Sequence, residues 1–234
     1  MIAQGYEIVG ANFQATEFAV GAFQHFKEGM AQANDLAPWG MVEELKLFSK
    51  AIHDQKILVD VGALFGLFSL VFTGRPGTKA YAIEASPWAF EVLQEQVELN
   101  PERNIEPYLA FAGSRAGEII TCGRDWYHVI AGLRAEEGVS TAITRLDDII
   151  PECDTIKIDT EGYEEEVLKG ADRLLRKYHP MLFIETHWSE VGKFGGTTES
   201  LINRLKSYDY TIKDLMGADV EVLNGGMSTR IVCT

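Results

Sequence analysis

The 234-residue sequence has few cysteines, no basic cluster and no long apolar run. Its three cysteines, Cys122, Cys153 and Cys233, form no CxxC pair, so we expect neither a zinc site built on cysteine pairs nor a disulfide framework. A run of about 18 apolar residues, which a membrane span needs, is missing, and the first residues lack the basic start and apolar core of a signal peptide. These absences predict a protein of the reducing cytoplasm that does not contact membranes.

Positive charge is also scarce. Lys and Arg number 21 against 35 Asp and Glu, which gives a formal net charge of −14. Nucleic-acid binding proteins gain most of their affinity by neutralising phosphates with basic patches, so DNA or RNA is not expected as a partner. A small-molecule or carbohydrate ligand fits this composition better, and assembly into a homo-oligomer stays open.

What the chain does contain is a regular alternation of apolar strands and amphipathic helices. Buried strands are predicted at 56–62, 79–86, 105–113, 154–162 and 180–187, and helices at 39–54, 64–75, 86–100, 163–178 and 197–209. Such alternation predicts an α/β fold with a mostly parallel sheet covered by helices on both faces. Two last strands, 210–215 and 228–234, flank an Asn-Gly-Gly turn and should pair antiparallel. We expect a helical N-terminal segment at 1–37 and one main domain at 38–234.

The stretch KILVDVGALFG places an acid, Asp60, two residues before the first of two glycines, Gly62 and Gly66. The spacing is GxxxG rather than the GxGxxG of dinucleotide sites, and an acid beside the turn would repel a pyrophosphate. Asp60 suits a cationic ligand instead. Glu84, at the end of the next strand, can accept hydrogen bonds from ribose hydroxyls, so the pair predicts S-adenosylmethionine. Alternatively, the two acids only cap the helices that follow.

Three small residues complete the predicted cofactor-binding set. Ala63 and Ala85 directly follow the first turn and Glu84, and Ser114 follows the third strand, where an adenine is expected. The placement of Ser114 is an inference from position alone, and a loop without ligand contact fits the sequence nearly as well.

A second acidic cluster follows the fourth and fifth strands. Asp159 and Glu161 end the stretch IKIDTE, and Glu185 and His187 share a strand face in FIETH. We predict that Asp159, Glu161 and His187 are catalytic, because carboxylates and a histidine can remove a proton from a hydroxyl. The same set could bind a divalent cation, although we assign no metal ligand, and His187 could equally be structural.

The stretches VDVGALFGLFSL, AIEASPWAFEVLQ, TRLDDI, IKIDTEGYEEEVLKGA and PMLFIETH resemble, in order and spacing, the FkbM-type family of S-adenosylmethionine-dependent methyltransferases. The resemblance implies a class I Rossmann-like fold with seven strands, the last antiparallel, and O-methylation of a hydroxyl on a sugar or natural product. It matches Asp60, Gly62 and Glu84 to cofactor-binding positions and Asp159, Glu161 and Gly162 to the family signature. Glu43 is matched to an acid that the family places before the glycine turn.

One departure from the family pattern stands at the turn. The family's GANIG is GALFG here, with Leu64 in place of Asn and Phe65 in place of Ile. A catalytically silent, S-adenosylmethionine-binding or assembly subunit with the same fold is therefore the alternative function. A nicotinamide-dependent dehydrogenase is disfavoured by the missing third glycine. We expect the choice of acceptor to depend on residues 117–144, which include Arg124, Trp126, Tyr127 and His128, and on the N-terminal segment.

Overall fold

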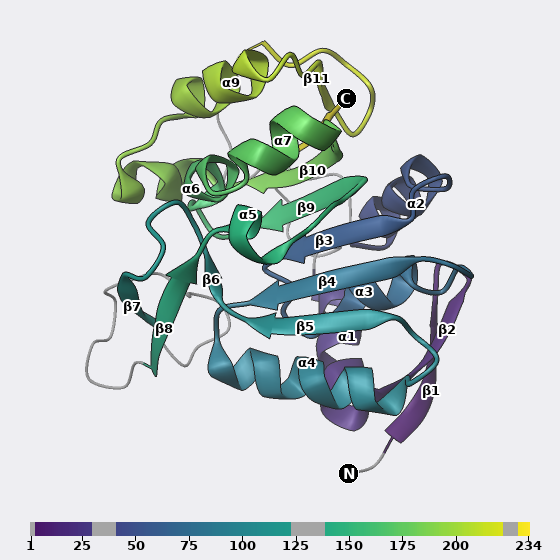
Figure 1. Cartoon of the computed structure of the whole chain (residues 1–234). Coiled ribbons are helices and arrows are strands. Elements are labelled where there is room, and N and C mark those ends of the chain that lie inside the picture. Colours follow the sequence, from purple (N-terminus) through teal and green to yellow (C-terminus); the bar gives the residue numbers. More distant parts are fainter. Residues whose placement is uncertain (1–2, 30–40, 123–138, 222–228) are drawn as a thin grey trace.

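The computed structural model describes residues 3–29, 41–122, 139–221 and 229–234. In these residues seven strands form the central sheet, in the order β11-β12-β10-β9-β3-β4-β5 (Figure 1). Strands β5, β4, β3, β9 and β10 run parallel, and β12 pairs antiparallel with both β10 and β11. This is the expected class I Rossmann-like topology, and it confirms the α/β prediction. The strands are β3 Ile57–Val61, β4 Lys79–Glu84, β5 Ile105–Leu109, β9 Thr155–Asp159, β10 Met181–Thr186, β11 Ile212–Asp214 and β12 Thr229–Cys233.

Helices cover the sheet on both faces (Figure 1). They are α1 Glu17–Gly29, α2 Met41–Ala51, α3 Leu67–Phe72, α4 Pro87–Leu99, α5 Leu146–Ile149, α6 Glu164–Lys169, α7 Asp172–Tyr178, α8 Trp188–Val191 and α9 Thr198–Ser207, with a short 3-10 helix at Gly192–Phe194. Helix α4 begins as the sequence predicts, because the Ser86 hydroxyl accepts a hydrogen bond from the Ala89 amide and Pro87 occupies the first helical position. Among the described residues, no helix is both long and apolar enough to cross a bilayer.

Alternate residues of the parallel strands build two hydrophobic clusters, one on each face of the sheet. Val59 and Ile158 join the cluster beneath α6, α7 and α9, whereas Leu58 and Phe183 join the cluster beneath α2, α3 and α4. The period of two also decides which polar side chains share a face. Asp60, Lys157 and Glu185 therefore fall on the α2 side, at the carboxyl ends of their strands.

The N-terminal segment differs from the expected helical 1–37. A hairpin, β1 Ala3–Ile8 and β2 Ala11–Thr16, precedes α1. The turn is formed by Val9 and Gly10, both with positive φ, and the buried Phe13 and Ala15 alternate along β2. The division at 37/38 lies outside the described residues and stays a prediction.

Two further predicted elements are divided. The expected strand 105–113 ends at Leu109, and β6 Phe111–Ala112 instead pairs with β8 Val139–Thr144, which also pairs with β7 Ile119–Cys122. The expected helix 163–178 breaks between α6 and α7 at Gly170, where a Cβ atom would lie 2.2 Å from the carbonyl oxygen of Gly113. In both cases tertiary contacts override a continuous local pattern.

Candidate functional site

The glycine turn between β3 and α3 lies against the end of β9. Gly62 has φ of 76°, and a Cβ atom added to it would lie 1.9 Å from the carbonyl oxygen of Asp159. Only glycine combines this left-handed conformation with so close a backbone approach. The turn predicted to bind the cofactor thus directly contacts the first residue of the second acidic cluster.

Glu84 connects the end of β4 to this turn. Its carboxylate accepts hydrogen bonds from the backbone amides of Leu64 and Ser86, both at 2.8 Å. Burial raises the pKa of Glu84, while these backbone hydrogen bonds oppose the shift. A carboxylate oxygen has two lone pairs, so each can still accept a ligand hydroxyl.

The departures at Leu64 and Phe65 have local consequences in the structure. Leu64 adopts φ of 51°, a left-handed conformation that Asn tolerates better than leucine does. Phe65 packs edge to face against Phe18 and Trp88, with ring centroids 5.5 to 5.7 Å apart in this trio. The larger side chain therefore closes an aromatic cluster between the turn and the starts of α1 and α4.

Asp60 is fully buried at the end of β3. It accepts a hydrogen bond from the Ser69 hydroxyl at 2.8 Å and lies 3.8 Å from the Lys157 ammonium group. Burial raises the pKa of Asp60, and Lys157 and Ser69 oppose that rise. Its Oδ1 atom has no hydrogen-bond partner among the described residues.

A row of charges crosses the neighbouring strands on the same face. Lys157 of β9 lies 3.5 Å from Asp159, and Arg230 of β12 lies 3.0 Å from Glu185 of β10. Burial would lower the pKa of Lys157, but Asp159 and Asp60 outweigh it and raise that pKa. Opposite charges on one face compensate for the burial of each group.

Helix α2 adds one carboxylate to this row, and it is not the predicted one. Glu43 is 48% exposed and pairs with Lys46 at 2.7 Å, whereas the buried Glu44 accepts a hydrogen bond from Arg230 Nε at 2.6 Å. The helix period turns residue 44 toward the sheet together with Leu45, and residue 43 toward solvent. Whether Glu43 contacts a cofactor stays a prediction.

His187, directly after β10, lies at the centre of the second acidic cluster. Its Nδ1 atom is 3.1 Å from Glu164 Oε1, and its Nε2 atom is 3.4 Å from Glu161 Oε2 and 3.9 Å from Asp159 Oδ1. The structure thus brings together the three residues predicted to be catalytic. Burial lowers the pKa of His187, but the Glu164 hydrogen bond and the surrounding carboxylates outweigh it and raise the pKa to about 9.

Glu161 holds a backbone conformation that is uncommon for a non-glycine residue. Its φ is 52°, and Gly162 follows with φ of 102°, where a Cβ atom would lie 2.6 Å from that of Glu190. Burial raises the pKa of Glu161 to about 7. The turn therefore presents a carboxylate that changes charge near neutral pH.

Three further residues are predicted to bind the cofactor, and their contacts differ. Ala63 is buried and donates its amide to the carbonyl of Ile83, as Gly62 also does. Ala85 accepts a hydrogen bond from Thr141 through its carbonyl, and the Ser114 hydroxyl is bound to Glu166. Whether Ala63, Ala85 and Ser114 contact a cofactor stays a prediction. Arg124, Trp126, Tyr127 and His128 lie outside the described residues.

Comparison with known proteins decides the family. The methyltransferase FkbM domain matches residues 60–212, which is more than half of the chain. This range contains the glycine turn, Glu84 and the cluster of Asp159, Glu161, Glu185 and His187.

The chain belongs to the FkbM methyltransferase family.

Solved structures agree with this FkbM fold. A methyltransferase FkbM from Methylobacillus flagellatus KT superposes with a TM-score of 0.54 at 22% identity, covering 77% of this chain and 44% of that one. The precorrin-6y C5,15-methyltransferase of Geobacter metallireducens GS-15 gives 0.51 at 17% identity, covering 88% and 94%. TYW2 of P. horikoshii in complex with MeSAdo gives 0.50 at 14% identity, covering 99% and 69%. No curated protein sequence matches the chain.

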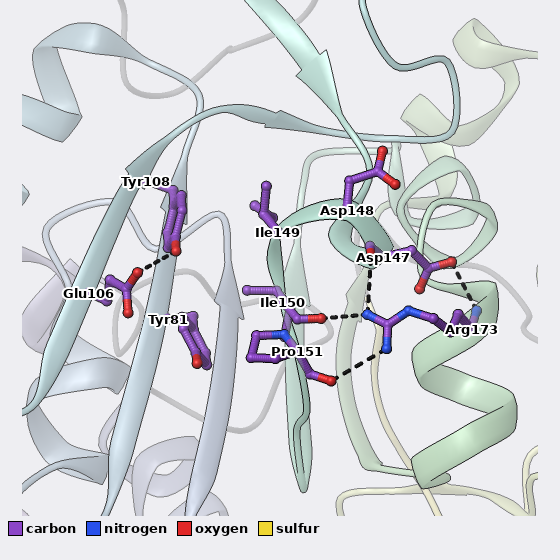
Figure 2. A pocket seen from close by; sticks show the side chains of 9 residues that line it. All are labelled: Tyr81, Glu106, Tyr108, Asp147, Asp148, Ile149, Ile150, Pro151 and Arg173. Atoms are coloured by element: carbon purple, nitrogen blue, oxygen red, sulfur yellow. Dashed lines mark hydrogen bonds between the residues drawn. The ribbon is translucent and has the colours of Figure 1, made fainter.

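The FkbM chain also has a cavity of about 480 Å³ away from this site (Figure 2). It lies over β4 and β5, on the face opposite to Asp60, and none of the predicted site residues lines it. Arg173 spans one wall by donating to the carbonyls of Ile150 and Pro151. The cavity is lined by Tyr81, Glu106, Tyr108, Asp147, Asp148, Ile149, Ile150, Pro151 and Arg173.

Sequence reasoning on this FkbM chain missed three charged residues of the site, Glu44, Lys157 and Arg230. Lys157 carries a recognisable signal, because a lysine inside the apolar strand IKID shares a face with Asp159 and needs a partner when buried. Arg230 in STRIVC carries the same kind of signal. Glu44 requires knowledge of the buried face of α2.

Proposed function

We propose that this FkbM methyltransferase transfers a methyl group from S-adenosylmethionine to a hydroxyl of a sugar or a small natural product. The observation that supports it best is the contact between Gly62 and Asp159, which joins the predicted cofactor half of the site to the acidic half. A methyl donor and a hydroxyl acceptor must meet in line, and positioning alone can contribute several kcal/mol.

The residues around the glycine turn fit the cofactor. Asp60 Oδ1 is buried without a hydrogen-bond partner among the described residues, and Glu84 ends the neighbouring strand with acceptor capacity left. Asp60, Gly62, Ala63, Glu84 and Ala85 would hold S-adenosylmethionine, whose sulfonium supplies an activated methyl group. These carboxylates suit a ligand that carries both positive charge and ribose hydroxyls.

The acidic half would orient the acceptor and take up its proton. Because its pKa is about 9, His187 already carries a proton at neutral pH and does not serve as the base. Glu161, with a pKa of about 7 and a side chain that is 41% exposed, is the better candidate for accepting the hydroxyl proton. Asp159 would then accept a hydrogen bond from the acceptor.

Calorimetry with S-adenosylhomocysteine tests the cofactor half. We expect wild type to bind it and E84Q to bind at least tenfold more weakly, because each lost charged hydrogen bond contributes about 1.5–3 kcal/mol. E152Q changes an exposed acid that is not among the predicted cofactor-binding residues, and it should bind S-adenosylhomocysteine as wild type does. No binding by folded wild type would overturn the proposal.

Turnover tests the acceptor half. S-adenosylmethionine is incubated with neutral sugars and hydroxylated natural products, and methylated products are identified by mass spectrometry. We expect a methyl ether on a hydroxyl, and E161Q should lower kcat more than it raises KM. A protein that binds the cofactor but methylates none of these acceptors would favour the catalytically silent subunit, which the Leu64 departure motivates.

A further inference from the structure

The imidazole of His187 has carboxylates at both of its nitrogen atoms. Glu164 lies 3.1 Å from Nδ1, on the inner side, and is fully buried. Glu161 and Asp159 lie 3.4 Å and 3.9 Å from Nε2, on the outer side. The His187 side chain is only 12% exposed, so the fold fixes the direction in which Nε2 points.

Glu164 has the properties of an outer-sphere carboxylate of a metal site. Its Oε1 atom accepts both the Gly162 amide at 2.9 Å and the hydrogen bond with His187 Nδ1. When a cation replaces the proton on Nε2, Nδ1–H still donates inward to Glu164 and the Nε2 lone pair faces Asp159 and Glu161. Metal-binding histidines almost always donate their second N–H to such a partner, which fixes the tautomer.

Glu164 also retains unsatisfied charge. Its Oε2 atom is buried and has no hydrogen-bond partner among the described residues. Next to the cluster, Asp60 Oδ1 is buried in the same way and has only the 3.8 Å ion pair with Lys157. The surroundings of His187 therefore hold carboxylate oxygens that neighbouring side chains do not fully satisfy, which favours positive charge in the cluster.

The spacing of the three outer groups fits a cation. One ligand atom from each of Asp159, Glu161 and His187 lies within 4.8 Å of the others. Ligand atoms around an ion with bonds of about 2.1 Å lie roughly 3–4 Å apart, so small side-chain movements would complete the geometry.

We propose that Asp159, Glu161 and His187 Nε2 bind a first-row divalent cation. Glu164 fixes the orientation of the imidazole through its hydrogen bond with Nδ1. The imidazole nitrogen favours Mn²⁺, Fe²⁺ or Zn²⁺ over Ca²⁺ and Mg²⁺, which prefer oxygen ligands alone. One oxygen of Glu161 is a ligand, and the second remains open to the acceptor.

Exposure and neighbouring charge agree with this assignment. Asp159 and Glu161 are 30% and 41% exposed, so the open coordination positions face the side from which an acceptor hydroxyl would approach. That role in turnover rests on the proposed function. The Lys157 ammonium group lies 3.5 Å from Asp159 and would repel a bound cation. Asp60 also pairs with Lys157 and neutralises part of this positive charge.

Mn²⁺ alone is the probe. Its binding is followed by the loss of the free-ion electron paramagnetic resonance signal and by calorimetry, with and without S-adenosylhomocysteine. We expect wild type to bind one Mn²⁺, H187Q to bind at least tenfold more weakly, and E164Q to lose tenfold to a hundredfold. E152Q should match wild type, and all variants should keep their affinity for S-adenosylhomocysteine within about twofold.

Each other outcome has a defined meaning. Equal Mn²⁺ affinity in wild type, H187Q and E161Q would overturn the site, as would no Mn²⁺ binding by protein that binds S-adenosylhomocysteine. The partly exposed E161Q serves as the second variant if H187Q fails to fold. Ca²⁺ displacing Mn²⁺ at equal concentration would overturn the assigned role of the imidazole. Mn²⁺ binding without S-adenosylhomocysteine binding would support the site and count against the proposed function.

Discussion

Replacing Gly62 by alanine tests whether the glycine turn and the end of β9 depend on each other. The added Cβ atom would lie 1.9 Å from the Asp159 carbonyl oxygen, whereas ordinary contacts begin at 3.4 Å, so the two segments must separate by about 1.5 Å. Gly77 provides the matched control. Its φ of 74° is nearly the same as the 76° of Gly62, and a Cβ atom there would meet nothing within 4 Å.

The two substitutions share one cost and differ in the other. A left-handed conformation costs an alanine about 1–2 kcal/mol at either position. Overpacking lowers the unfolding free energy by a further 1–3 kcal/mol, roughly, and this second cost applies to G62A but not to G77A. For a chain of this size 1 kcal/mol corresponds to roughly 2–4 °C in Tm, so we expect G77A to lose about 2–8 °C and G62A clearly more.

The assay combines thermal and urea unfolding with calorimetric titration of S-adenosylhomocysteine. G62A should also bind S-adenosylhomocysteine at least tenfold more weakly, because the turn moves away from Asp159, while G77A should bind it as wild type does. Equal losses of unfolding free energy in G62A and G77A would refute the close approach. A destabilised G62A with unchanged S-adenosylhomocysteine affinity would refute the role of the turn in cofactor binding.

Three further predictions concern the buried charges. S69A removes the hydrogen bond that the Ser69 hydroxyl donates to Asp60 and should lower the unfolding free energy by about 1–3 kcal/mol, measured by urea unfolding at pH 7; an effect below about 0.5 kcal/mol would contradict the pairing. Because folding raises the pKa of His187 from 6.5 to about 9, its stabilisation is complete below pH 6.5 and lost as pH rises through 9. Wild type in a chelating buffer should therefore lose up to about 3 kcal/mol relative to H187Q between pH 6 and 9.5, and parallel pH profiles would exclude this. R230M leaves buried carboxylates without their cation and should cost about 3–5 kcal/mol, of which E185Q in the same chain should restore part; no restoration would show that the two residues are not coupled.

The sheet and the glycine turn could be predicted because their signals are local. An apolar run that ends in an acid and a glycine specifies a buried strand and the turn after it, whatever lies around it. The strand containing Val59 and Asp60 ends at Val61, one residue before the predicted end, and the strand containing Ile158 ends at Asp159, where the turn begins three residues earlier than predicted. The period of two then places both acids on one face.

The N-terminal hairpin and the break after α6 could not be predicted in this way. β1 has five of six residues exposed or half-buried, so it lacks an apolar pattern and is held by pairing with β2. The helix break at Gly170 depends on the carbonyl of Gly113, which is 57 positions earlier in the sequence. A pattern read over a short stretch of sequence cannot indicate contacts between residues so far apart.

The sequence predicts which residue types form the site, but it does not predict which charged residues pair with one another. Asp159, Glu161 and His187 come together as expected. The choice between Glu43 and Glu44 needs the orientation of α2, which only packing defines. The pairing of Arg230 with Glu44 joins residues 186 positions apart.

The assembled charges limit the acceptor in a way that no single motif does. Six carboxylates face three basic groups, which gives a formal charge of −3 with His187 protonated, and −2 with a divalent cation on neutral His187. The groups are Glu44, Asp60, Asp159, Glu161, Glu164 and Glu185 against Lys157, His187 and Arg230.

An excess of negative charge in a partly buried site repels anions in either state. Burial raises the pKa of Glu161 and of Glu185 to about 7, so proton uptake relieves part of the excess at lower pH. We therefore expect a neutral sugar to be methylated in preference to its sulfated form, whose charge is constant, and the ratio of their kcat/KM values to grow from pH 6 to pH 8. A preference for the sulfated sugar, or a ratio that falls with pH, would mean that the acceptor does not approach these carboxylates.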